Sequence, residues 1–274
     1  MSQTFPVEPS NVTFTYEQAS EFAKVTLHGD YLLGSYLTRE RLSAYRKQGF
    51  HTLVDFGCGP GNSTKPLTPL LQPGGRLVGV DVSEDMLAEA RKLNAGFCVP
   101  EETTTPANSP GTLEYLRILS DSQGRETIPL DGGSVDAVAS RVVLQELQTE
   151  AQLRNAFSEI HRILRRGGAF VSICVNDRIT DQDFISMSYK PFPENQTRQD
   201  GLRKCLSTAT ALIWEKDRHW SQEFLDAALH DAGFSHVHFE RPLPPPGLVP
   251  FPSQPDVSWK DESFFPPFLV FTAT

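Results

Sequence analysis

The sequence has little of what disulfide-built, zinc-binding or membrane-spanning proteins depend on. Its four cysteines are Cys58, Cys98, Cys174 and Cys205, and no two of them form a C-x-x-C pair. This spacing indicates neither a zinc site nor a disulfide framework. No run of 18 or more apolar residues occurs, so we expect no membrane-spanning helix. The amino-terminal stretch lacks the basic start and apolar core of a secretory signal, and we expect a cytoplasmic protein.

Positive charge is also scarce. The chain has 25 Lys and Arg against 34 Asp and Glu, which gives a formal net charge of -9. No unbroken basic run is longer than a pair such as Arg165-Arg166. Since nucleic-acid-binding surfaces carry a basic excess, we expect no nucleic-acid partner. No cluster of His, Cys and acidic residues has metal-ligand spacing, so we also expect no metal. The oligomeric state is expected to be monomer or homodimer.

What the sequence does contain is an alternation of short apolar runs and amphipathic stretches. Such alternation predicts an α/β fold of the Rossmann-like, doubly wound type, with a mostly parallel sheet and helices on both faces. In such sheets the ligand crevice lies at the carboxyl ends of the strands. We expect strands at residues 51–56, 77–80, 113–119, 135–139, 169–175, 236–240 and 268–272, and helices at residues 83–94, 150–164 and 221–232.

Two segments stand outside that alternation. Residues 1–48 are predicted to form an amino-terminal helical cap, with a break between two short helices in the region of Gly29 and Gly34. Residues 49–274 then form the main domain. Within it, residues about 177–220 are mixed polar and aromatic, and we interpret them as an insert that covers the sheet's edge and the substrate.

The strongest functional pattern runs from Leu53 to Gly61 and reads LVDFGCGPG. An apolar strand with an acid near its end, Asp55, is followed by glycines that let the backbone approach a ligand closely. The acid suits a ligand that carries an ammonium group. Asn62 occupies the sixth position, so the dinucleotide fingerprint G-x-G-x-x-G fails. A helix should follow, with Asn62 or Ser63 as its cap. The plainer alternative for the glycines is a tight turn between strand and helix.

Asp81 is the second candidate, because it ends the next expected strand, Val78-Gly79-Val80-Asp81. A carboxylate in this place can accept hydrogen bonds from both hydroxyls of a ribose. The alternative is an Asp that caps a helix or lies on the surface.

Together these residues resemble the class I S-adenosylmethionine (SAM)-dependent methyltransferases, over about residues 50–176 and weakly over 220–274. The glycine loop looks like that family's first motif and Asp81 like its ribose-binding acid. Asp121-Ser122 resembles the adenine-side loop, and Glu159 to Gly168 matches the family's E-x-x-R-x-L-x-x-G-G signature.

The resemblance implies SAM as cofactor, S-adenosylhomocysteine as product, and a seven-stranded sheet whose last strand is reversed. It implies a small-molecule methyl acceptor that receives the methyl group on an N or O atom, and the aromatic content of the cap suggests an aromatic or heterocyclic metabolite. The cofactor-binding residues are then expected to be Asp55, Gly57, Cys58, Gly59, Gly61, Asp81, Val82, Met86, Asp121, Ser122 and Ser140.

Residues on the acceptor side are harder to derive, because the catalytic group depends on the acceptor. A general base is needed only if the acceptor keeps its proton at neutral pH. The candidates are Tyr16, Arg141, Asn176 and His219, each of which has a structural alternative. Two other functions stay open: a SAM-binding cyclase or lyase that does not methylate, and a nicotinamide-dependent oxidoreductase.

Overall fold

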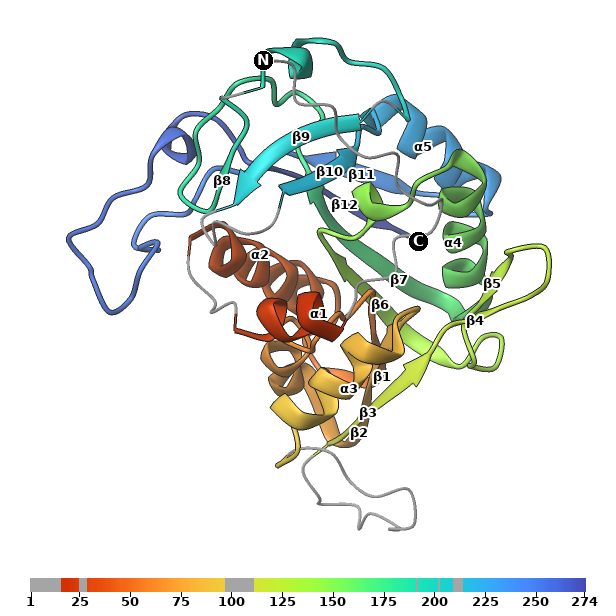
Figure 1. The fold of residues 1–274 in the computed structure, drawn as a ribbon. Coiled ribbons are helices and arrows are strands. Elements are labelled where there is room, and N and C mark those ends of the chain that lie inside the picture. Colours follow the sequence, from red (N-terminus) through yellow and green to blue (C-terminus); the bar gives the residue numbers. More distant parts are fainter. Residues whose placement is uncertain (1–15, 25–28, 97–110, 191, 202, 209–213) are drawn as a thin grey trace.

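The computed structural model describes residues 16–24, 29–96, 111–190, 192–201, 203–208 and 214–274. At its centre is a seven-stranded sheet in the order β11-β12-β7-β6-β1-β2-β3 (Figure 1). Every pairing in it is parallel except the two made by β12, so the expected reversed last strand is confirmed. The strands are β1 Phe50–Phe56, β2 Leu71–Asp81, β3 Thr112–Arg117, β6 Val135–Arg141, β7 Leu164–Val175, β11 Val237–Glu240 and β12 Phe268–Ala273.

The central strands are buried on both faces, which explains why they read as nearly continuous apolar runs. Successive residues of β1 illustrate the two faces. Leu53 packs with residues of α2 and α3, whereas Val54 joins a cluster under α4 and α5. Both side chains are fully buried. A helical layer therefore covers each face of the sheet, as the sequence predicts.

The three expected helices of the main domain form where local capping rules place them. The elements are α3 Glu84–Leu93, α4 Glu150–Ile163 and α5 Gln222–Asp231. Ser83 and Ser221 cap α3 and α5 through their hydroxyls, and Thr149 forms a capping box with Gln152 at α4. None of the helices that the structure describes is long and apolar enough to span a membrane.

The segment after the glycine loop differs from the expectation of a capped α-helix. It forms a 3-10 helix, η1 Lys65–Leu70, whose N-cap residue is Thr64 without a side-chain cap bond. The expectation that Asn62 or Ser63 caps this helix is therefore wrong. Pro66 and Pro69 each remove a backbone donor, which accounts for the tighter, shorter helix. The hydroxyls of Ser63 and Thr64 bind Asp55 instead.

The amino-terminal segment forms two helices, α1 Tyr16–Ala23 and α2 Gly29–Tyr45. Gly29 begins the second helix, but Gly34 lies inside it, so the expected break at Gly34 is wrong. Helix α2 packs on β6, β7 and η1. Leu33, Leu37 and Leu42 of this helix are buried in two of the three apolar clusters. Helix α2 is thus tightly built into the structure that surrounds the glycine loop.

Between β7 and α5 the chain forms a separate three-stranded antiparallel sheet in the order β10-β9-β8 (Figure 1). Its strands are β8 Met187–Ser188, β9 Arg203–Thr208 and β10 Trp214–Arg218, and η3 Pro193–Gln196 lies between the first two. Strand β10 contacts η2 Leu144–Glu146, which follows the carboxyl end of β6. The remaining elements are the hairpin β4 Leu119–Ser120 with β5 Glu126–Thr127, and η4 Asp261–Ser263.

Two buried carboxyl groups join the start of α2 to the insert and to η4. Asp30 exchanges hydrogen bonds with Ser186, through both its backbone N–H and its carboxylate, at 2.9 Å each. Glu262 accepts from the backbone N–H of Ile185 at 2.6 Å. Burial, then the charge of Glu262 and a hydrogen bond to it, raise the pKa of Asp30 well above its ordinary value, and only the charge of Lys260 and the bond from Ser186 oppose this. Burial and the neighbouring carboxyl group therefore favour the protonated form of Asp30.

Asp30→Asn is expected to flatten the pH dependence of stability. A raised folded-state pKa means that folding retains a proton that the unfolded chain releases near pH 4, so stability falls as the pH rises from there through the folded-state pKa. An amide donates permanently to Glu262 and removes this loss. The variant should gain on the order of 1–2 kcal/mol over wild type at pH 8 and little at pH 4. Denaturant unfolding across this range measures the gain.

The matched control is Asp183→Asn, because Asp183 lies in the same region but is partly exposed and pairs with Lys260 at 3.4 Å. This change should leave the wild-type pH profile in place. A gain for Asp30→Asn that is the same at pH 4 and pH 8 would contradict the raised pKa of Asp30.

Candidate active site

The glycine loop is held under the end of β2, and its three glycines have different surroundings. Gly57 donates its N–H to the carbonyl of Val80 at 2.8 Å. A Cβ at Gly57 would lie 2.4 Å from Val143 Cγ1, and one at Gly61 would lie 2.6 Å from Asn94 Nδ2. At Gly59, where φ is +51°, a Cβ would meet no atom within 4 Å. Gly57 and Gly61 are thus required by packing, whereas Gly59 borders open space.

Asp55 lies behind this loop and is fully enclosed. Its Oδ2 accepts hydrogen bonds from Ser63 Oγ at 2.9 Å and from Thr64 Oγ1 at 2.7 Å. Burial raises the pKa of Asp55, although the two hydroxyls and the nearby Arg141 act in the opposite direction. Asp55 therefore holds the loop's far side in place, and its contact with a ligand ammonium group stays a prediction.

Asp81 ends β2 and ties the loop to the next helix. Its Oδ2 accepts from the N–H of Gly59 and its Oδ1 from the N–H of Ser83, both at 2.9 Å. Burial raises the pKa of Asp81, and these backbone bonds oppose the increase. Each carboxylate oxygen has room for more than one hydrogen bond. Asp81 can thus accept from two ligand hydroxyls beside the open face of Gly59 without releasing the loop.

The other expected cofactor residues have varied surroundings. Cys58 and Met86 are each 3% exposed, and burial raises the pKa of the Cys58 thiol well above its usual value. Val82 is partly exposed next to Asp81. Asp121 and Ser122 are exposed in the β4–β5 turn, where Arg125 and backbone N–H groups lower the pKa of Asp121. Cofactor contacts by these residues stay predictions.

Ser140 and Arg141 lie at the carboxyl end of β6, beside β1. Ser140 is fully buried, and its hydroxyl has no hydrogen-bond partner among the residues that the structure describes. The guanidinium of Arg141 donates to the carbonyl of Tyr31 in α2 at 3.1 Å. Burial lowers the pKa of Arg141, and the charge of Asp55 opposes this. A small cavity brings Arg141 and Asp55 together with Ser35 and Thr38 of α2, Ser63, Leu67 and Ala139.

The other three acceptor-side candidates, Asn176, His219 and Tyr16, have different surroundings. Asn176 donates to the carbonyl of Pro266 at 2.7 Å and accepts from Arg178 and Arg241, so its amide is committed to the fold. His219 is 5% exposed and lines a cavity. Tyr16 begins α1, but its side chain lies outside what the structure describes.

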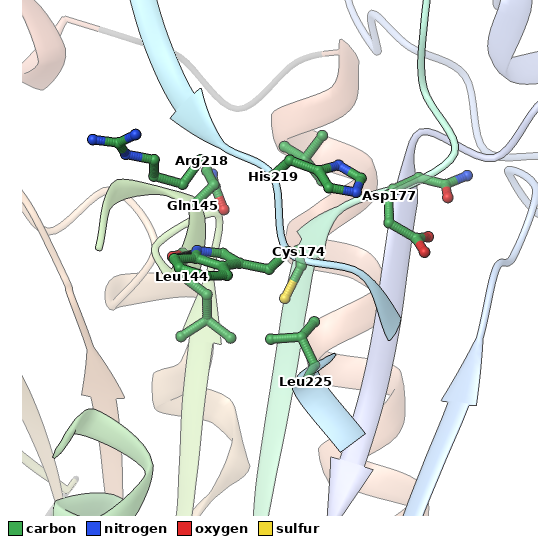
Figure 2. A pocket seen from close by; sticks show the side chains of 10 residues that line it. Leu144, Gln145, Cys174, Asp177, Arg218, His219 and Leu225 are labelled. Carbon is green, nitrogen blue, oxygen red and sulfur yellow. Dashed lines mark hydrogen bonds between the residues drawn. The ribbon is translucent and has the colours of Figure 1, made fainter. Parts of the chain in front are cut away.

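The cavity beside His219 opens between the carboxyl ends of β6 and β7 and the end of β10 (Figure 2). It is a small cavity that is partly open to solvent. Sequence reasoning missed most of its lining, which includes Gln145, Cys174, Asp177 and Trp220. The position of residues 144–145 just after a strand end was the available signal, because such loops line the crevice of an open sheet.

A comparison with known families matches the central part of the chain. The model of a family described as a methyltransferase domain matches residues 54–172, from the glycine loop to β7. The same span carries the glycine loop, Asp81 and the parallel strands described above. This segment of the chain is therefore similar to the methyltransferase domains of that family. The resemblance stated from the motifs is thereby confirmed.

Individual relatives match this chain at modest identity. It is 33% identical to an uncharacterized methyltransferase of Synechocystis over 121 residues, which are 44% of this chain and 45% of that protein. It is 26% identical to a demethylmenaquinone methyltransferase of Lactiplantibacillus plantarum over 191 residues, covering 69% and 72%. The chain covers only 28% and 45% of two of the curated relatives that it matches.

Solved structures support the fold. A SAM-dependent methyltransferase of Aquifex aeolicus superposes with a TM-score of 0.55 at 14% identity, covering 95% of this chain and 98% of that one. One of Mesorhizobium loti gives a TM-score of 0.53 at 21% identity, covering 85% and 95%. At these identities the likeness concerns the fold alone.

The residues of this chain fit the family's cofactor. The open space at Gly59 admits a ligand where any side chain would intrude. Asp81 offers carboxylate oxygens beside that space, and Ser140 offers a buried hydroxyl at the next strand end. The fit of SAM to this chain therefore rests on the open space at Gly59, the Asp81 carboxylate and the Ser140 hydroxyl.

Proposed function

We propose that this protein transfers a methyl group from SAM to an N or O atom of a small-molecule acceptor. The observation that carries the proposal is the open cradle at Gly59 beside the Asp81 carboxylate. The cavity that His219 lines, at the carboxyl ends of β6 and β7, supports an acceptor of small size. The net charge of -9 disfavours nucleic acid as the acceptor.

The role of the protein in such a transfer is mainly to position the reactants and exclude water. SAM supplies a methyl group that its sulfonium charge has already activated. In our proposal Asp81 orients the ribose, and the glycine loop lets the backbone lie close to the cofactor. Helix α2 encloses the end of the site next to Asp55 and Arg141. An alcohol acceptor would need a base, for which His219 is the candidate; an amine already free of its proton would not.

Calorimetric titration with S-adenosylhomocysteine tests the proposal most directly, with NADH as the comparison ligand. We expect S-adenosylhomocysteine to bind at one site and NADH to give no heat. Binding of NADH alone would overturn the proposal and return Asp81 to a dinucleotide ribose role. Binding of S-adenosylhomocysteine without methyl transfer to any acceptor in a mass-shift screen would favour a cyclase or lyase.

A further inference from the structure

The side chain of Gln145 stands out among the buried polar groups near the site. It is 3% exposed, and neither its amide nitrogen nor its amide oxygen has a partner among the described residues. It lines the small cavity at the carboxyl ends of β6 and β7 (Figure 2). A buried amide without partners costs stability, since both of its polar atoms have lost water. Gln145 therefore suits a ligand that supplies both bonds.

The backbone that carries Gln145 is itself strained. Val142 has a φ of +56°, a left-handed conformation that β-branched residues rarely adopt. Its N–H donates to the carbonyl of Ile173 at 2.7 Å, which helps to hold the turn. The next residue, Val143, packs against Gly57 of the glycine loop. The strained turn thus places Gln145 at the cavity, and its Val143 contacts the glycine loop. Backbone strain of this kind is concentrated at functional sites.

The charged groups around the cavity are already paired or occupied. Asp177 accepts from Arg241 at 2.6 Å and from the backbone of Gln222 at 3.2 Å. Arg218 donates to the carbonyl of Gly201 and to Gln148, and Figure 2 shows its guanidinium directed away from His219 and Asp177. Leu144, Cys174, Val175, Trp220 and Leu225 supply apolar walls. These surroundings favour an uncharged ligand.

We infer that Gln145 is a specificity-determining residue that recognises an uncharged edge with a hydrogen-bond donor next to an acceptor. A lactam, a pyridone or a primary amide presents such an edge, and a carboxamide pairs with it through two parallel hydrogen bonds. The acceptor of the methyl group therefore carries this edge. This inference rests on the proposed function only in naming the ligand as the methyl acceptor; the recognition itself does not require methyl transfer.

The test uses 2-pyridone as the probe and N-methyl-2-pyridone, which lacks the donor, as the matched ligand. Both are titrated into the full chain by ligand-observed NMR, with and without S-adenosylhomocysteine. We expect 2-pyridone to bind about tenfold or more tightly than its N-methyl analogue. Gln145→Met, which keeps the length of the side chain and removes the amide, should abolish that preference. Equal binding of the two probes, or binding of neither, would overturn the inference.

Thermal stability separates recognition from a structural role. Gln145→Met should raise the Tm by about 2–4 °C, because it removes an unsatisfied buried amide. The control is Gln148→Met, since the amide of Gln148 donates to the carbonyl of Glu146 at 2.7 Å and accepts from Arg218 at 3.2 Å. This control should lower the Tm. A fall in Tm for Gln145→Met as well would show that Gln145 is structural.

The outcomes also distinguish this inference from the proposed function. If S-adenosylhomocysteine fails to bind while 2-pyridone binds through Gln145, methyl transfer is wrong and the recognition site stands. If S-adenosylhomocysteine binds and the pyridone preference is absent, the cofactor assignment stands and the inference about Gln145 is wrong.

Discussion

Gly59→Val is expected to abolish the binding of S-adenosylhomocysteine, with at least about a 100-fold loss of affinity. A Cβ at this position would point into space that no atom occupies within 4 Å, so the valine side chain would fill the cradle itself. The φ of +51° adds backbone strain of about 1–2 kcal/mol for a residue other than glycine. Calorimetric titration of the purified variant measures the loss.

The strain needs its own control, and the chain offers one in Gly133. This glycine has a φ of +69°, and a Cβ on it would likewise meet nothing within 4 Å. It precedes the amino end of β6, whereas the glycine loop follows the carboxyl end of the parallel strand β1. The two glycines therefore lie at opposite ends of the strands. Gly133→Val should therefore lose similar stability and bind S-adenosylhomocysteine as wild type does. If Gly59→Val also bound within about threefold of wild type, the space beside Gly59 would not be the cofactor site.

The difference between these two glycines shows what the sequence could and could not provide. Both are glycines next to a strand, and nothing in their local sequence says which one faces a ligand. The G-x-G-x-G pattern marked Gly59 only because an apolar strand precedes it and Asp81 ends the next strand. Patterns that combine two strand ends carry information on the site, because parallel strands bring their carboxyl ends together.

Elements with local signals were predicted well. Helices α3, α4 and α5 form close to their expected ranges, and Ser83, Thr149 and Ser221 cap them; a cap depends only on residues within one turn. The central strands were predictable for a related reason: burial on both faces leaves an apolar run. The cap of η1 was predicted wrongly, because the Ser63 and Thr64 hydroxyls bind Asp55 and not the helix end.

Contacts between segments far apart in the chain left no trace in the sequence. Asp30 and Glu262 come together only through the fold, and neither position looks unusual in its local context. The same holds for Gln145, whose unpartnered amide becomes visible only when the insert closes the cavity around it. The proposed acceptor side is built from such contacts, and of the sequence candidates only Asn176 and His219 are among the residues that line this cavity.

Asp81→Ala is the second change with a large expected effect, and it tests the ribose role apart from the loop anchor. In wild type, Asp81 holds the N–H of Gly59 and of Ser83. Removing the carboxylate loosens the glycine loop, so the affinity for any ligand that binds beside Gly59 should fall. A ribose contact would add a further loss that depends on the ligand hydroxyls. Each hydrogen bond to a charged group contributes about 1.5–3 kcal/mol, so two bonds correspond to about 100-fold or more in affinity.

The two roles separate in a cycle that removes the ligand hydroxyls as well as the carboxylate. Wild type should prefer S-adenosylhomocysteine over its 2′,3′-dideoxy analogue by about 100-fold, and Asp81→Ala by about threefold or less. Asp85→Ala, which removes an exposed acid in the first turn of α3, should keep the full wild-type preference. A preference that survives in Asp81→Ala would mean that the carboxylate serves only to anchor Gly59 and the start of α3. The ribose would then have to be bound elsewhere, because Asp81 is the acid that ends β2 beside the open face of Gly59.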